Sequence, residues 1–142
     1  MTFDQLVQVY YDQVLGLVDG GVDLLLPETT FDTLNLKACL FAIEKLFDVP
    51  GRRLPILASV TFIDKSGRTI SGQTLDAFFT SIFHVPLMAV GINCALGPDL
   101  MGPYVEELSR LALLPTFAYP NAGLPNEFGG FDVGPDEIAK AL

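Results

Sequence analysis

The sequence predicts an α/β fold with a parallel sheet, and three observations support this class. Stretches of helical periodicity alternate with short apolar runs four times, at intervals of roughly 30 residues, the size of one β/α unit. The apolar runs are hydrophobic throughout, which is typical of parallel strands that are covered on both faces. The chain has 142 residues and is 50% hydrophobic, so it can build the core of one domain of ordinary size.

The first part of the chain is predicted to hold two helices with a strand between them. Thr2 begins the first helix with Gln5 as its capping-box partner, and Gly20-Gly21 ends it. The continuous apolar run 22–26 predicts a strand. Residues 33–47 predict the second helix because apolar side chains recur there at helical spacing.

The rest of the chain continues the alternation. The predicted elements are a strand over 56–62, a helix over about 74–83, a strand over 87–92, a helix over about 99–113, a strand over 116–119 and a helix from Pro135. Two architectures accommodate four parallel strands in this order: an open doubly wound sheet, or part of a (β/α)₈ barrel. A complete barrel needs about 250 residues, so this chain could supply only half of one.

Composition excludes several classes of protein. The chain has eight basic and 17 acidic residues, which gives a net charge of −9. Because the basic residues are scattered along the sequence, no nucleic-acid partner is expected. No apolar stretch approaches the ~18–20 residues of a membrane helix, and the N-terminus lacks the pattern of a signal peptide. Two cysteines are too few for a disulfide scaffold. We therefore expect a cytoplasmic protein without a membrane partner.

Polar loops follow all four predicted strands, whereas the turns that lead from helix to strand are short, such as Gly-Gly, Gly-Arg-Arg and His-Val-Pro. Because chemistry in α/β folds gathers at the carboxyl ends of parallel strands, these loops predict one functional face. The candidate residues there are Glu28, Asn93, Cys94 and Asn121.

Simpler structural roles remain open for the individual residues. Glu28 could cap the following helix, Cys94 could be a small buried hydrophobe, and Asn121 could be a turn former. Cys39 lies in the middle of a predicted helix, where packing is the expected role. His84 stands at a helix end, where contact with the helix dipole is the expected role.

The polar loops resemble those of one known family. They are similar to the homocysteine-binding domains of cobalamin-dependent methionine synthases, in the homocysteine S-methyltransferase family, and the similarity covers essentially the whole chain. The matching segments are Gly21–Leu26, Glu28-Thr29, Phe31–Asn35, Asp64–Thr74, Gly91–Pro98 and Tyr119–Asn126.

The resemblance implies a (β/α)₈ TIM barrel that binds zinc at the carboxyl ends of its strands. Cys94 matches the first of three thiolate ligands, and the other two are an adjacent Cys-Cys pair after the last strand of the family's barrel. The implied reaction is methyl transfer from methylcobalamin, which a separate domain delivers, to the zinc-bound thiolate of homocysteine, giving methionine.

Further roles carry over residue by residue. Glu28 matches the acidic residue that faces the amino group of homocysteine. Asn121 matches a residue that contacts the zinc or fills its open position, and Asn93 and the segment 64–74 line the same pocket. Pro27 departs from the family pattern, which usually has an aliphatic or small residue at this position. Proline has no N–H for a strand ladder, so it is unfavourable in a central parallel strand.

The resemblance also implies that the chain is only part of this domain. Residues 1–142 match strands four to seven of the barrel, without the first three strands and without the last strand and its Cys-Cys motif. The expected partners are homocysteine, the remaining barrel segments and the methylcobalamin domain. The alternative is a non-catalytic, stand-alone α/β module, or a truncated gene product that acts through a partner.

Overall fold

The computed structural model describes residues 1–62, 66–123 and 125–141, and it confirms the α/β class. The sheet has three parallel strands in the order β1-β2-β3. They are β1 (Leu57–Val60), β2 (Ala89–Asn93) and β3 (Thr116–Tyr119). Ala58 lies beside Val90, and Ile92 lies beside Ala118, so neighbouring strands end at the same edge of the sheet.

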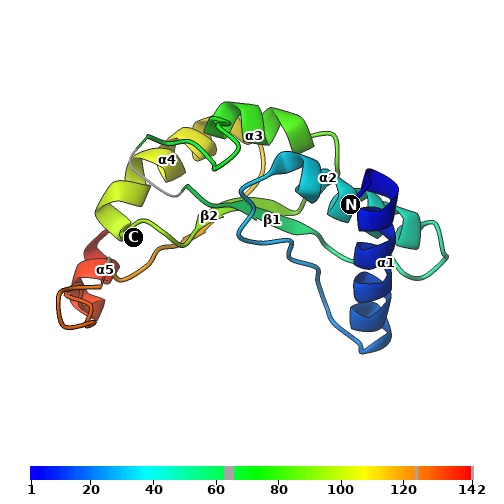
Figure 1. Cartoon of the computed structure of the whole chain (residues 1–142), viewed down its shortest axis with the longest axis horizontal. Coiled ribbons are helices and arrows are strands. Elements are labelled where there is room, and N and C mark those ends of the chain that lie inside the picture. The colour runs from blue at the N-terminus through cyan, green and yellow to red at the C-terminus, as the bar shows by residue number, and fades with distance from the viewer. Residues whose placement is uncertain (63–65, 124, 142) are drawn as a thin grey trace.

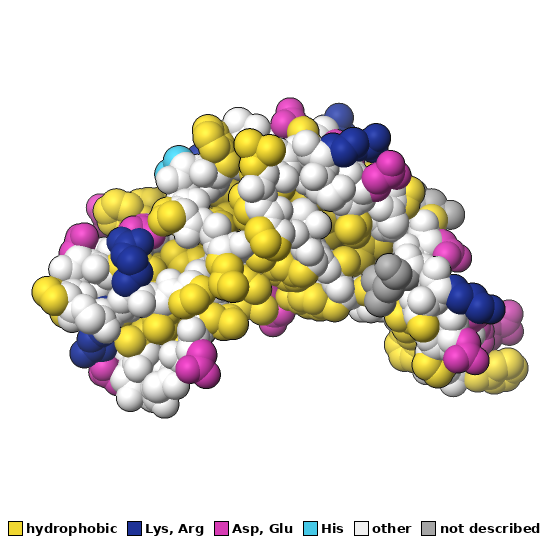
Figure 2. Space-filling view, turned by 180° about the vertical axis from the view of Figure 1, so that it is seen from behind, with side chains coloured by type: hydrophobic (Ala, Val, Ile, Leu, Met, Phe, Trp, Pro, Cys, Tyr) yellow, Lys and Arg dark blue, Asp and Glu magenta, His cyan; other side chains and the backbone are white. Residues whose placement is uncertain are grey.

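The helices give the chain the shape of an arch (Figure 1). They are α1 (Phe3–Asp19), α2 (Thr33–Phe47), α3 (Leu75–Ile82), α4 (Pro98–Leu111) and α5 (Pro135–Ala141). Helices α2, α3 and α4 lie along one face of the sheet, while α1 and α5 extend from the two ends of the arch. Figure 2 shows hydrophobic side chains gathered along the hollow between these ends.

The prediction that the strands are covered on both faces is confirmed for β2, which is buried throughout, and for most of β1, but it is wrong for β3. Residues on β3 remain half-buried or exposed, and Leu24 and Leu26 also stay partly exposed. Helices α2 to α4 lie on one side of the sheet, and its other, concave side faces the hollow, where hydrophobic side chains gather.

Local sequence signals account for the helix boundaries. Thr2 Oγ1 accepts a hydrogen bond from the Gln5 N–H at 3.3 Å and the Thr2 N–H donates to Gln5 Oε1 at 2.9 Å, which confirms the capping box. Asp32 and Thr74 cap α2 and α3 through their side-chain oxygens. Gly21 follows α1 with a φ of 86°, a conformation that favours glycine.

The hydrophobic core lies between the sheet and helices α2 to α4. Its largest fully buried side chains are Phe62, Phe78, Leu40, Ile43, Leu46, Ile56, Leu75, Ile82, Ile92, Met101, Leu108 and Val60. Cys39 belongs to the same core, which confirms its packing role.

The segment 22–26 does not form the strand that its sequence predicts. It makes only an isolated bridge between Leu25 and Ile56. The Leu25 N–H donates to Pro55 O and the Leu57 N–H donates to Leu25 O, each at 2.9 Å. The next donor of this ladder would be the N–H of Pro27, which proline lacks. Pro27 therefore pairs with β1 only through its carbonyl oxygen, which accepts from the Ser59 N–H at 3.1 Å.

One extra residue then enters the pairing with β1. The bridges join Leu25 to Ile56 and Thr30 to Val60, so five steps along one segment oppose four along the other. This is the arrangement of a β-bulge. Thr29 lies within it with a φ of 55°, and its N–H points away from the β1 backbone toward side chains of the sheet.

Gly91 makes room for an aromatic pair on the concave face. A Cβ atom at Gly91 would overlap the ring of Phe117, which stacks on Tyr119 with ring centroids 5.8 Å apart and an angle of 9° between the planes. Glycine at this position therefore allows Phe117 to support Tyr119 at the end of β3.

We expect Gly91→Ala to lower the free energy of unfolding by about 1–3 kcal/mol, because the added methyl group must displace the Phe117 ring. Urea denaturation measures this change. Gly16→Ala is the matched control, since nothing lies within 4 Å of its Cβ position in α1, and it should stabilise the chain by up to about 1 kcal/mol. An equal, small effect of both substitutions would contradict the packing described for Phe117.

Candidate functional site

Glu28, Asn93 and Cys94 come together at the carboxyl ends of the strands. Asn93 is the last residue of β2, Cys94 follows it, and Glu28 lies on the bulged segment beside β1. Ser59 on β1 and Tyr119 at the end of β3 join the same hydrogen-bond network. Parallel strands that end at one edge of the sheet bring these distant residues together.

Asn93 is the centre of the network and is fully buried. Its Oδ1 accepts hydrogen bonds from the Thr29 N–H at 3.2 Å and from Ser59 Oγ at 2.8 Å. Its Nδ2 donates to Thr29 Oγ1 at 2.8 Å and to Cys94 Sγ at 3.1 Å. A primary amide offers two acceptor positions and two N–H donors, so all four are used. The orientation of the amide is fixed because the Thr29 N–H can only donate.

Glu28 is exposed, and its carboxylate accepts a hydrogen bond from Tyr119 Oη at 2.8 Å. Burial raises the pKa of Tyr119, and the hydrogen bond to Glu28 and the charge of that carboxylate raise it further. Asp32, and not Glu28, caps α2, so the capping role considered for Glu28 is wrong. No ion pair joins Glu28 to a basic residue among the described side chains.

Cys94 begins a tight turn after β2. Cys94 and Ala95 both adopt the left-handed conformation, with φ values of 58° and 57°, which is unusual for residues that have a Cβ atom. The Cys94 N–H donates to Tyr119 O at 3.2 Å, and its side chain is half-buried. Cys39, by contrast, is buried, and burial raises the pKa of its thiol to about 12.

Asn121 lies beside the Cys94 turn but outside the hydrogen-bond network. Its N–H donates to Leu96 O at 3.0 Å, while its side chain has no hydrogen bond to a described residue. The turns after β2 and β3 are in close contact, since a Cβ atom added at Gly97 would lie only 3.4 Å from Gly123 Cα. The backbone of Asn121 is therefore held beside the turn that Cys94 begins.

Asp64 and Lys65 of the loop 64–74 lie outside the described part of the chain, and its later residues contact the start of α2 and helix α4. Ser71 Oγ donates to Phe31 O at 3.0 Å, and Thr33 Oγ1 donates to Gln73 Oε1 at 2.7 Å. A Cβ atom at Gly67 would lie 2.6 Å from the Tyr104 ring on α4. The described part of this loop thus fixes the start of α2.

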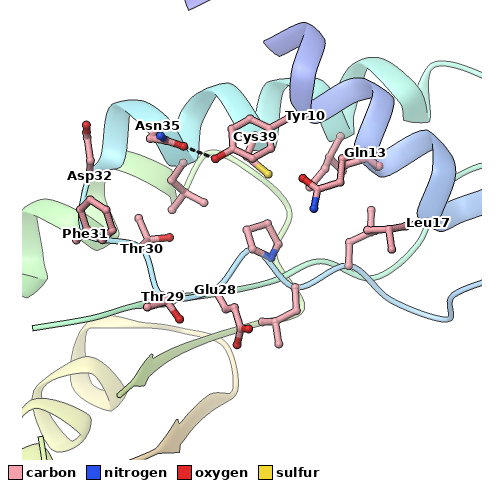
Figure 3. A pocket seen from close by; sticks show the side chains of 16 residues that line it. Tyr10, Gln13, Leu17, Glu28, Thr29, Thr30, Phe31, Asp32, Asn35 and Cys39 are labelled. Atoms are coloured by element: carbon pink, nitrogen blue, oxygen red, sulfur yellow. Dashed lines mark hydrogen bonds between the residues drawn. The ribbon is translucent and has the colours of Figure 1, made fainter. Parts of the chain in front are cut away.

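Glu28 also lines a cavity of about 440 Å³ between α1, α2 and the segment that joins them (Figure 3). Tyr10 and Asn35 lie at the opposite end, where Tyr10 Oη donates a hydrogen bond to Asn35 Oδ1. Burial is the main cause of the raised pKa of Tyr10. Leucine, valine and isoleucine side chains from both helices form the apolar part of the wall.

The donor set for a metal ion is incomplete in the part of the chain that the structure describes. Those residues contain no group of three His, Cys, Asp or Glu side chains placed to hold one ion. Cys94 could supply one thiolate and Asn121 one amide oxygen, whereas zinc sites in proteins are almost always four-coordinate. These two donor types occur in zinc sites, but two residues do not form a whole site.

A sequence model of the homocysteine S-methyltransferase family matches residues 1–142. The chain belongs to this family. Its structure is similar to the crystal structure of the apo form of homocysteine methyltransferase MmuM from Escherichia coli, with a TM-score of 0.73 and 24% sequence identity. The match covers 99% of this chain and 50% of MmuM, so the fold corresponds to a fragment of that enzyme's fold. None of the described helices has the length and apolar character needed to span a membrane.

Three network residues were not singled out from the sequence. Thr29 and Tyr119 stand inside the matching segments, and Ser59 lies within a predicted strand. Ser59 could have been noticed because it is a polar residue in an otherwise apolar run, but its contact with Asn93 depends on the register of β1 and β2.

The two cysteines should differ strongly in reactivity. At pH 8 we expect iodoacetamide to alkylate Cys94 at least about 100-fold faster than Cys39, since a thiol with a pKa of about 12 is only ~10⁻⁴ ionised and is also buried. Peptide mass spectrometry measures both rates, and both cysteines should react in denaturing urea as a control. Comparable native rates would contradict the burial of Cys39.

Proposed function

We propose that the chain supplies part of the site of a homocysteine S-methyltransferase that converts homocysteine to methionine. In this proposal residues 1–142 are strands four to seven of the family's TIM barrel. The family match over the whole chain supports it most strongly. The convergence of Glu28, Asn93 and Cys94 at one edge of the sheet gives independent support, because it places an acidic group and a thiol in one network.

Glu28 is proposed to bind the ammonium group of homocysteine. Its carboxylate is exposed and has no basic partner among the described residues, so a cationic group from the substrate can approach it. Tyr119 holds one carboxylate oxygen through its hydroxyl group and leaves the other free to accept a second hydrogen bond.

Cys94 is proposed as one thiolate ligand of zinc, with Asn121 beside the same ion. Bound zinc would lower the pKa of the homocysteine thiol and so favour the nucleophilic thiolate. Cys94 lies on a fixed turn, and its sulfur accepts a hydrogen bond from Asn93, so its position does not depend on the metal. The missing ligands are proposed to come from the remaining barrel segments.

Methylcobalamin is the proposed methyl donor, presented by a separate domain as in methionine synthase. Both cysteines of the chain are free thiols, which suits the reducing cytoplasm that we propose as its compartment. The competing function is a non-catalytic module, which is favoured by the incomplete donor set of the described residues. The two functions differ in whether the chain forms a working site once the rest of a barrel is supplied.

The test is a complete barrel in which residues 1–142 are joined to the segments that MmuM has beyond the matched half. We expect this protein to bind one zinc ion and to demethylate methylcobalamin when homocysteine is present. Cys94→Ala should abolish both properties. Glu28→Gln should keep the zinc but weaken homocysteine binding by about 1.5–3 kcal/mol, roughly 10- to 150-fold, because the amide loses the charged contact.

Glu106→Gln is the matched control, since this glutamate is 70% exposed on α4 and should leave zinc and homocysteine binding unchanged. Calorimetry measures homocysteine binding, and elemental analysis measures zinc content. A well-folded barrel that keeps zinc and turnover after Cys94→Ala would show that the proposed ligand is wrong. A folded barrel with neither property would favour the non-catalytic module.

A further inference from the structure

Two strained backbone positions lie on either side of one buried amide. Thr29 has a φ of 55° and Cys94 a φ of 58°, and both are non-glycine residues. The conformation of Thr29 is especially unfavourable because its side chain is branched at Cβ. Residues in such conformations are strained and persist only where surrounding contacts enforce them.

Asn93 makes contacts to both positions. Its Oδ1 accepts from the Thr29 N–H, and its Nδ2 donates to Thr29 Oγ1, so Asn93 binds the bulged residue at two points. The second proton of Nδ2 points at Cys94 Sγ. Ser59 takes the remaining acceptor position, and the backbone oxygen of Asn93 accepts from Thr61 Oγ1.

These contacts leave Asn93 with no free group for a substrate. The side chain is fully buried, and both acceptor positions and both donors are occupied within the protein. A ligand could bind Asn93 only if one of these internal bonds were broken, which would leave a buried polar group unpaired.

We propose that Asn93 is a positioning residue that fixes Glu28 relative to Cys94 and does not itself touch the substrate. It does so through Thr29, which is covalently joined to Glu28, and through the sulfur of Cys94. The carboxylate side and the thiol side of the site are thereby held by one amide. The inference rests on the proposed function for the identity of the substrate, but the contacts of Asn93 stand without it.

The test follows the alkylation rate of Cys94 in the 142-residue chain at one fixed pH. Asn93→Asp keeps an acceptor for Thr29 and Ser59 but replaces the N–H that faces the sulfur by a carboxylate oxygen. We expect the rate of alkylation by iodoacetamide to change at least about tenfold, because the Cys94 sulfur loses the N–H that holds it in place. Ile82→Val is the control for general destabilisation, since Ile82 is a buried core residue of α3, and it should leave the rate within about twofold.

A second variant shows whether Thr29 acts through Asn93. Thr29→Val removes the Oγ1 acceptor and should change the Cys94 rate at least about threefold in the wild-type background, but not in the Asn93→Asp background. Thr29→Ser restores the hydroxyl group and should restore the rate. Circular dichroism establishes that each variant is folded.

Equal rates in wild type, Asn93→Asp and Thr29→Val would overturn the positioning role. An effect of Thr29→Val that persists in the Asn93→Asp background would overturn it too, since Thr29 would then act by another route. If these rates behave as expected but the completed barrel has no methyltransferase activity, the proposed function fails and the role of Asn93 stands.

Discussion

The site depends on the complete burial of one primary amide at the end of β2. An amide that is removed from water must find four hydrogen-bond partners within the protein, and Asn93 finds them on Thr29, Ser59 and Cys94. Ser59 lies on β1, whereas Thr29 and Cys94 lie outside the regular strands in the left-handed conformation. The requirement to satisfy this amide therefore fixes the relative positions of the bulged segment, β1 and the turn after β2.

Pro27 explains why the segment before Glu28 can take part. Since proline gives no N–H to the β1 edge, the ladder loses one hydrogen bond at Pro27, and a bulge follows at Thr29. The bulge turns the Thr29 N–H from the β1 backbone toward the Asn93 and Ser59 side chains. Pro27, which weakens strand pairing, thus contributes to the position of Glu28, whose carboxylate accepts a hydrogen bond from Tyr119 on β3.

Much of the fold was predictable because its signals are local. The capping box at Thr2, the helix over 33–47 and the strand over 116–119 follow from nearby residues alone. The prediction of a strand over 22–26 was wrong because it followed from hydrophobicity and gave too little weight to the missing N–H of Pro27. The polar loops identified Glu28, Asn93 and Cys94 as candidates. The full set of contacts of Asn93 and the role of Tyr119 depend on strand register and on a left-handed Thr29, which single-sequence patterns do not encode.

The most direct test of this account is amide hydrogen exchange of residues 28 and 29, measured by NMR on the intact chain. The Thr29 N–H is held by Asn93 Oδ1 and Ser59 Oγ, whereas the Glu28 N–H has no hydrogen-bond partner among the described residues. The account predicts that Thr29 exchanges at least about 100-fold more slowly than Glu28, although both residues are exposed. Equally fast exchange at both positions would show that the buried amide does not hold the bulge, and would contradict the account.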